Sequence, residues 1–294
     1  MAGIFGFFDY TKPGKGVSKD APKKKGVALY FHILLKRFWK FITLNLIYLI
    51  ASIPAILISW FISTYFVTWL AVQAQINIGE AVTTLNLLSV LVTIVFLHMW
   101  GSGPATAALT YVLRKYANDT HAWVWSDFKD SFKSNFKQGI IVYLINTAVF
   151  SLLFLAFLFY SYMQSATVFL ALRSVVLVML ALFYMMQTYV YQMIAGFELK
   201  LKYVYRNAFL LTTIALPKNI LTGVVVGAII YAIFSLSLRM PLAGILVIGL
   251  LMYTLLSFTQ IFMTNNTVKK HMLQSSANQD TDKAEDFDSD FEDA

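Results

Sequence analysis

Long apolar runs alternate with short polar or basic segments along the 294-residue chain. A helix needs about 20 apolar residues to cross the hydrocarbon core of a bilayer. The apolar runs cover residues 41–61, 83–97 with an uncharged continuation to 112, 139–159, 174–196, 220–238 and 242–263. This pattern predicts an all-α polytopic membrane protein with about six transmembrane helices.

Two of the connections between these runs are short. Residues 160–173 separate the third and fourth runs, and the turn of Arg239, Met240 and Pro241 separates the fifth and sixth. Short connections leave neighbouring helices antiparallel. We therefore expect two antiparallel hairpins.

The second run is interrupted by the sequence Gly101-Ser102-Gly103-Pro104. Proline lacks the backbone N–H that a helix needs and clashes with the carbonyl four residues earlier, and glycine has a low helix propensity. The chain is therefore predicted to bend or unwind there. Gly101, Gly103 and Pro104 are candidate kink residues that turn the chain into the polar segment after them.

A basic and aromatic segment follows this break. Its large side chains recur at steps of three, four and four residues, which places them on one face of an amphipathic helix. They are Trp125, Phe128, Phe132 and Phe136. Such a helix either lies in the lipid headgroup layer or fills a groove on a partner, and both interpretations stay open. The four aromatic residues are candidate partner-binding residues.

The two ends of the chain differ in composition from its middle. Residues 12–25 hold six lysines among glycines and prolines, so a flexible basic arm is predicted over residues 1–26. Residues 280–293 carry eight carboxylates and one lysine, so a disordered acidic tail is predicted over residues 273–294. Between the two lies the predicted six-helix transmembrane domain, residues 27–272.

Basic residues are distributed asymmetrically between the predicted loops. Of the 23 lysines and arginines, 21 lie in the terminal segments or in the segments after the second and fourth runs. Only Arg173 and Arg239 lie in the opposite loops. The positive-inside rule therefore predicts that both termini and both long connections are cytoplasmic.

Composition excludes several classes of protein. Hydrophobic residues make up 59% of the chain and charged residues 13%, a balance that soluble domains do not keep. The chain has no cysteine, which excludes disulfides and thiolate metal sites, and its four histidines show no metal-ligand spacing. We expect no catalytic residues, no metal, no cofactor and no nucleic acid, with the lipid bilayer as a partner.

Few polar residues interrupt the apolar runs. Aspartate and glutamate are missing from the interior of every predicted span, which argues against ion-coupled transport. His98 and Gln187 are the candidate intramembrane polar residues. His98 lies beside the glycine–proline break, where it is either a titrating gate or a neutral residue bonded to a neighbouring helix.

Three motifs resemble the YesL-like family of bacterial membrane proteins. They are Phe-Phe-Asp-Tyr with Lys-Pro-Gly within residues 7–14, Gly-Pro-Ala-Thr-Ala with Leu-Thr-Tyr-Val-Leu-Arg within residues 103–114, and Trp-Ser-Asp-Phe at residues 125–128. Members of that family are often encoded beside carbohydrate ABC transporters. The resemblance therefore implies a location in the bacterial plasma membrane and an accessory role in sugar uptake. Gln192 departs from the family pattern, which favours proline there.

Residues 198–217 are similar at both ends to the cytoplasmic coupling loop of ABC importer permeases. Glu198 matches the first glutamate of that loop, and an Ile-x-Leu-Pro sequence ends on Pro217. Val204 stands where the loop has glycine, so the turn that docks on an ATPase is not reproduced. Chance agreement, common ancestry and mimicry all stay open.

Three classes of function remain. We expect a non-catalytic accessory or assembly subunit of a carbohydrate ABC importer, which contacts the permease subunits and their ATPase through its spans and cytoplasmic helices. The alternative is a permease-like protein that itself carries a small solute, although polar lining is scarce. A membrane enzyme is the least favoured class, because no nucleophile, base and orienting group occur at usable spacing in the spans.

Overall fold

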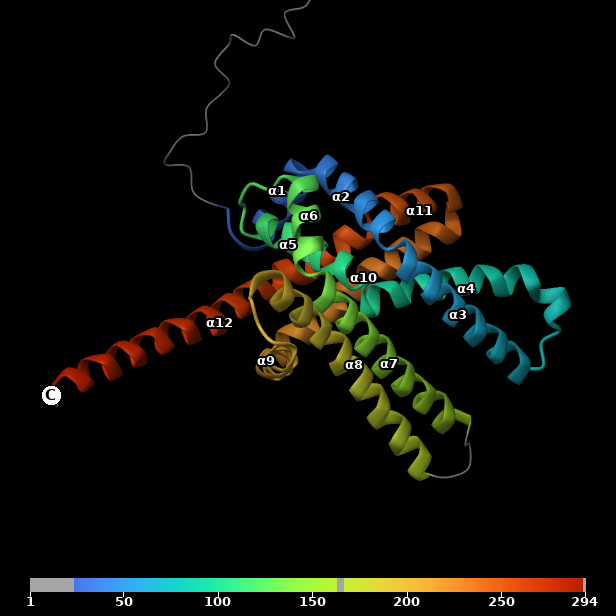
Figure 1. Cartoon of the computed structure of the whole chain (residues 1–294). Helices are drawn as coiled ribbons and strands as arrows, with labels where there is room; N and C mark the ends of the chain where they lie inside the picture. Colours follow the sequence, from blue (N-terminus) through green and yellow to red (C-terminus); the bar gives the residue numbers. More distant parts are fainter. Residues whose placement is uncertain (1–23, 163–166, 293–294) are drawn as a thin grey trace, which may run out of the picture.

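The computed structural model describes residues 24–162 and 167–292, and in these ranges all regular elements are helical. The helices are α1 Gly26–Lys36, α2 Phe38–Ala51, α3 Ile53–Gln73, α4 Ile78–Trp100, α5 Pro104–Ala117, α6 Val124–Ser134, α7 Phe136–Tyr162, α8 Thr167–Gly196, α9 Leu201–Ile214, α10 Leu216–Arg239, α11 Pro241–Val247, the π-helix η2 Ile248–Met252, and α12 Tyr253–Glu292 (Figure 1). The all-α prediction is confirmed.

Six helical segments of the described chain are long and apolar enough to cross a membrane. They are Ile53–Gln73, Val82–Met99, Phe136–Ser161, Thr167–Gly196, Leu216–Arg239 and Pro241–Met272. The predicted number of spans is thus confirmed, and the chain is a multi-pass membrane protein.

The position of the first predicted span is wrong. The long apolar helix is α3, which begins at Ile53, whereas the prediction placed the span at residues 41–61. The earlier apolar residues belong to α2, whose Phe41, Leu44 and Tyr48 are buried inside the protein. Hydropathy does not distinguish a side chain buried in protein from one that faces lipid, because both are apolar.

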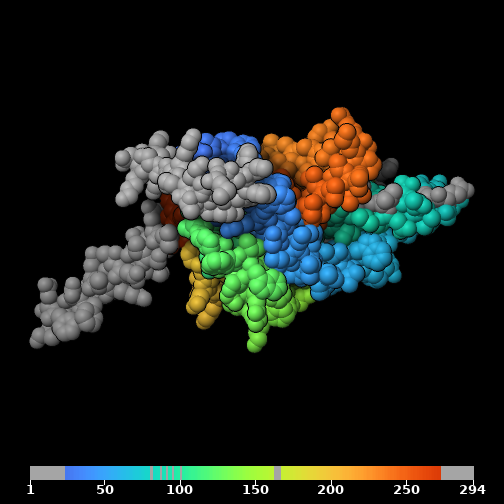
Figure 2. Space-filling model, turned by 90° about the horizontal axis from the view of Figure 1, so that it is seen from above, coloured from blue at the N-terminus to red at the C-terminus, as the bar shows by residue number. Residues whose placement is uncertain are grey.

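Helices α3 and α4 pack together, as do α7 with α8 and α10 with α11. The last two pairs are the predicted hairpins, and Met240 alone separates α10 from α11. Figure 1 shows the α3–α4 and α7–α8 pairs extending from the body of the protein in different directions. Seen from above in Figure 2, α3 and α4 project away from the body.

Helix α5 lies at the centre of the fold. It contacts α2, α6, α7, α8 and α12, and its fully buried side chains are Ala105, Ala107, Ala108, Val112, Leu113 and Tyr116. Alanines allow helix backbones to approach closely. The predicted continuation of the second span to residue 112 is therefore wrong, because α5 is a separate helix enclosed by protein.

A π-helix interrupts the last apolar run. The Nδ2 atom of Asn45 donates to the carbonyl of Gly249 at 2.7 Å, and the backbone N–H of Thr254 donates to Oδ1 of Asn45 at 3.0 Å. A π-turn disturbs the ordinary pairing of backbone groups, and one side-chain amide supplies both a donor and an acceptor. Asn45, fully buried on α2, thus holds η2 in place.

The structure describes most of the C-terminal segment of the chain but only the last residues of the N-terminal arm. Helix α12 continues to Glu292, so no change of secondary structure marks the predicted start of the acidic tail at residue 273. Extending an existing helix needs no new nucleation, which explains helical backbone in a segment of disorder-promoting composition. Most of the predicted basic arm, residues 1–23, lies outside the described residues.

Candidate functional site

The glycine–proline break forms a tight turn between α4 and α5. Helix α4 ends at Trp100, and α5 begins at Pro104, where the missing N–H costs no helical hydrogen bond. The backbone φ angles of Gly101 and Gly103 are 77° and 65°, in the left-handed region that favours glycine. The three candidate kink residues thus lie at the break between α4 and α5.

The turn also packs against other helices without room for a side chain. A Cβ atom on Gly103 would lie 2.8 Å from the carbonyl oxygen of Gly139 on α7, and one on Gly139 would lie 2.7 Å from the nitrogen of Pro104. A Cβ atom on Gly101 would lie 2.7 Å from the hydroxyl of Tyr191 on α8. The turn therefore joins α4 and α5 to α7 and α8.

Hydroxyl groups line the turn on the side of α2. Ser52 and Ser102 have their Oγ atoms 2.7 Å apart, and the backbone N–H of Ser102 donates to Oγ1 of Thr106 at 2.7 Å. The hydroxyl of Tyr48 lies 3.4 Å from the same Thr106 oxygen. These bonds supply partners for polar groups that the turn removes from helix pairing.

A small polar cavity of about 40 Å³ lies beside the turn. Three helices meet there through His98 on α4, Tyr184 on α8 and Gln260 on α12. The Nε2 atom of His98 lies 3.2 Å from the hydroxyl of Tyr184, which accepts from Nε2 of Gln260 at 2.7 Å. His98 therefore bonds to a neighbouring helix, as one of its two predicted roles requires.

Gln187 also lines this cavity and is only 4% exposed. Neither its amide nitrogen nor its amide oxygen has a hydrogen-bond partner in the described part of the chain. The structure thus brings Gln187 to the same cavity as His98 and Gly101, two candidate residues that precede it by more than 80 positions in the sequence.

Neutral hydrogen-bonding groups make up the polar lining of the cavity. Besides His98 its polar lining consists of amides and hydroxyls. A water molecule needs a cavity volume of roughly 10–15 Å³. The cavity therefore has room for only a few water molecules. Small-molecule sites are typically about 300–1,000 Å³. Among the described residues, no group of three or more His, Asp or Glu could hold a metal ion.

Replacing Gln187 with leucine should raise the Tm of the purified protein, measured by thermal unfolding in detergent. The two side chains are similar in size, and a buried amide without partners costs about 1–3 kcal/mol. Gln192 is the matched control on the same helix, because its Nε2 donates to Thr264 at 2.8 Å, so Gln192→Leu should lower Tm. A lower Tm for Gln187→Leu would show that its amide is paired in solution.

Arg114 joins the end of α5 to the end of α8. Its guanidinium Nη1 donates to the carbonyl of Gln192 at 2.7 Å and its Cζ lies 5.3 Å from the ring centroid of Phe197. A Cβ atom on Gly196 would collide with the guanidinium, so a larger residue there would displace Arg114 from this position. Burial lowers the pKa of Arg114. A cation near a helix C-terminus is stabilising.

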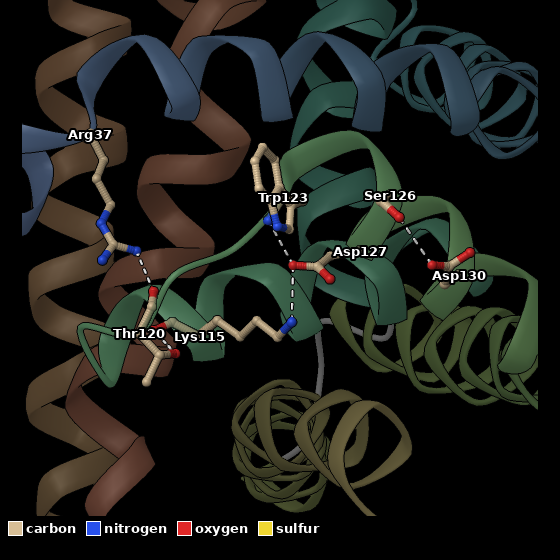
Figure 3. Close-up of polar contacts among 7 residues, drawn as sticks. All are labelled: Arg37, Lys115, Thr120, Trp123, Ser126, Asp127 and Asp130. Atoms are coloured by element: carbon tan, nitrogen blue, oxygen red, sulfur yellow. Dashed lines mark hydrogen bonds and ion pairs between the residues drawn. The ribbon is translucent and has the colours of Figure 1, made fainter.

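The α5–α6 connection is held by two ion pairs, shown in part in Figure 3. Lys115 Nζ lies 3.0 Å from a carboxylate oxygen of Asp127, which also accepts from the N–H of Trp123 at 2.9 Å. Arg37 lies 3.0 Å from Asp119 and donates to the carbonyl of Thr120 at 2.8 Å. These contacts hold the α1–α2 corner against α5.

Two ionisable groups near this connection have shifted pKa values. Burial lowers the pKa of Lys115, but its hydrogen bond to Asp127 and the nearby negative charges outweigh this effect and raise the pKa overall. Burial raises the pKa of Tyr116 to about 12, so the phenol stays neutral.

The aromatic residues of the predicted amphipathic helix do not form one exposed face. Phe128 is 4% exposed and belongs to the core, with Phe132 partly buried against it, whereas Trp125 and Phe136 are 65% and 45% exposed. Phe136 lies beyond the end of α6, at the first residue of α7. The inward face of α6 therefore packs against its own chain, mainly α5, and not against a partner or lipid.

Glu198 and Pro217 lie on either side of α9. Glu198 lines a cavity of about 790 Å³ with Asp127, Asp130 and Lys200, and Pro217 is in the first turn of α10. The helix between them has exposed Tyr203 and Phe209. These two candidates are not part of the cavity beside the Gly–Pro turn.

Three residues of the site were not predicted from the sequence: Tyr184, Thr106 and Arg114. A tyrosine or threonine within an apolar run resembles its neighbours in hydropathy, and only the helix contacts show what its hydroxyl binds. The charge of Arg114 could have marked it, since Arg114 is the first charged residue after the uncharged continuation of the second run.

Part of the chain is similar to a known protein family. Residues 82–157 match the model of the DUF624 family, described as a protein of unknown function. The match covers about a quarter of the chain and includes the Gly–Pro turn, α5 and α6. No curated protein and no solved structure matches the chain.

Proposed function

We propose that this protein is a non-catalytic accessory or assembly subunit of a carbohydrate ABC importer in the bacterial plasma membrane, with both termini in the cytoplasm. The importer class rests on the YesL-like resemblance, with which the match to DUF624 is compatible. The proposed activity is to bind permease subunits through transmembrane helices and to aid their assembly.

The observation that carries the proposal is an open aromatic groove between α3 and α7. It has a volume of about 680 Å³ and an almost wholly apolar lining, which includes Phe61, Tyr65, Phe66, Trp69, Phe150 and Phe154. The rings of Phe66 and Phe154 meet at 4.6 Å between centroids. Transmembrane helices associate largely by van der Waals packing, and such a groove offers a shaped surface for a partner helix.

The alternative, a permease that carries a solute itself, has weaker support. The polar cavity inside the helix bundle measures about 40 Å³, far less than a sugar requires. The larger groove between α3 and α7 opens outward and is apolar, whereas sugars are recognised by polar groups. Both observations favour a protein that contacts other membrane subunits.

Helix α9 supplies a second proposed contact, with the ATPase. It lies between Glu198 and Pro217, the two matches to a permease coupling loop. Phe209 and Ile214 are more than half exposed, and Arg206 is exposed beside them. An outward face with apolar and basic residues is suited to a protein groove.

The experiment that tests the proposal introduces a bulky residue into the groove. Ser151 on α7 lines the groove, so Ser151→Trp should fill it without removing a native apolar contact. Tagged protein would be purified in mild detergent from cells that also express the permease subunits and ATPase of a carbohydrate ABC importer. The expected result is at least a tenfold loss of co-purifying permease subunits, with normal insertion and yield.

Ser174→Trp is the matched control, because Ser174 is exposed on α8 and does not line the groove. Its co-purification should equal that of the wild type. Undiminished recovery of permease subunits with Ser151→Trp would rule out the groove as their binding surface. Solute uptake into vesicles that contain this protein alone would instead support the permease alternative.

A further inference from the structure

The first helix, α1, presents an exposed apolar stripe. Val27, Phe31 and Leu35 recur at steps of four residues and are 72%, 55% and 73% exposed. Trp39, four residues further along in α2, is 77% exposed. Within α1, side chains at this spacing share one helix face.

The opposite face of α1 is anchored to the protein. Ile33 is fully buried, and the hydroxyl of Tyr30 lies 2.8 Å from Oγ1 of Thr259 on α12. The ring of Tyr30 also stacks on Phe258 at 5.3 Å between centroids. Thr259 is close to the predicted cytoplasmic end of the last apolar run, at residue 263. Anchoring at this level places the stripe near the boundary between hydrocarbon and headgroups.

Cationic side chains flank the stripe. Lys24, Lys25, Lys36 and Lys40 are exposed, and residues 24–40 include no aspartate or glutamate. Within the described chain the ion pairs use Arg37 and Lys115 rather than these four lysines. The surface is therefore both apolar and positively charged.

We propose that the outward face of α1 and the start of α2 bind anionic phospholipid headgroups, with the stripe in the headgroup layer and the four lysines on the phosphates. Charge complementarity selects this occupant, because each lysine near an anionic leaflet adds attraction that a zwitterionic leaflet does not supply. An exposed Trp39 suits the same layer, since indole rings favour the membrane interface. This inference does not depend on the importer assignment.

The test uses the absence of native cysteine, which allows one label at one position. The full chain with Leu35→Cys, carrying an environment-sensitive NBD fluorophore, would be placed in nanodiscs that contain from 0 to 50% phosphatidylglycerol in phosphatidylcholine. The expected result is a blue shift and increased quenching by headgroup-proximal spin-labelled lipid as phosphatidylglycerol increases. At high salt the response should weaken, because the Debye length shortens.

Two variants define the role of charge. Replacing Lys24, Lys25, Lys36 and Lys40 with glutamine should raise the phosphatidylglycerol fraction needed for half the response at least fivefold. The matched control replaces Lys129, Lys133, Lys137 and Lys202, four other exposed lysines, and should leave that midpoint unchanged.

Two results would overturn the inference. A label that is equally buried in pure phosphatidylcholine would show apolar contact without headgroup selection. A label that stays in water at every composition would show that lipid does not cover the stripe.

Discussion

Gly103→Ala should prevent most of the protein from reaching its folded state. Any residue with a Cβ at a φ of 65° pays about 1–2 kcal/mol. The new Cβ would also lie 2.8 Å from the Gly139 carbonyl oxygen, and overpacking costs about 1–3 kcal/mol more. Because the colliding atom belongs to the backbone, it cannot rotate away. Size-exclusion chromatography of a fluorescent fusion should show loss of the monodisperse peak.

Alanine substitutions at two further glycines test whether the clash causes the damage. Gly139→Ala should be similarly damaging, because it creates the reciprocal clash with Pro104 in an ordinary helical conformation. Gly227→Ala is the control: α10 has open space at that position, and alanine favours a helix by about 0.5–1 kcal/mol. A monodisperse Gly103→Ala protein with wild-type Tm would contradict the close approach of α5 to α7.

Phe128→Ala should lower the free energy of unfolding by about 3–5 kcal/mol, the usual cost of truncating a buried phenylalanine. Phe128 is 4% exposed and lies within the cluster that α5 organises. Its loss should also release Phe132, whose ring centroid lies 6.3 Å away. Thermal unfolding in detergent should show a clearly lower Tm and a reduced yield.

Trp125→Ala provides the matched comparison on the same helix. Trp125 is 65% exposed, so its removal leaves no cavity and Tm should stay close to the wild-type value. Equal loss of stability in both variants would mean that α6 does not direct Phe128 inward. Reduced co-purification of permease subunits with stable Trp125→Ala would identify the exposed tryptophan as a partner contact.

The apolar pattern could predict the number of spans because crossing hydrocarbon imposes a minimum length on any helix. It could also locate the Gly–Pro turn, since proline and glycine act locally on the backbone. It could not distinguish α2 and α5 from lipid-facing helices. Their burial depends on contacts with α12 and other distant segments, and hydropathy contains no term for such contacts.

The candidate site was predictable only in part for a related reason. His98 and Gln187 stand out because polar groups are rare in apolar runs, and the fold does bring them to one cavity. Periodicity correctly placed Trp125 and Phe128 on a helix. It could not show that α5 already covers the inward face of that helix, which leaves Trp125 exposed and Phe128 buried.

The π-helix has a consequence for the rotational phase of α12. One extra residue in a helix turns everything after it by about 100°. Leu256 and Phe258 are fully buried with the present phase, which Asn45 maintains from α2 by pairing with Gly249 and Thr254. The extra residue thus sets which side of the final helix meets the core, and Asn45 bonds to backbone groups on either side of it. A chain shortened by one residue within 248–252 would present the same side through an unbroken α-helix, and Asn45 would then have no backbone groups to pair.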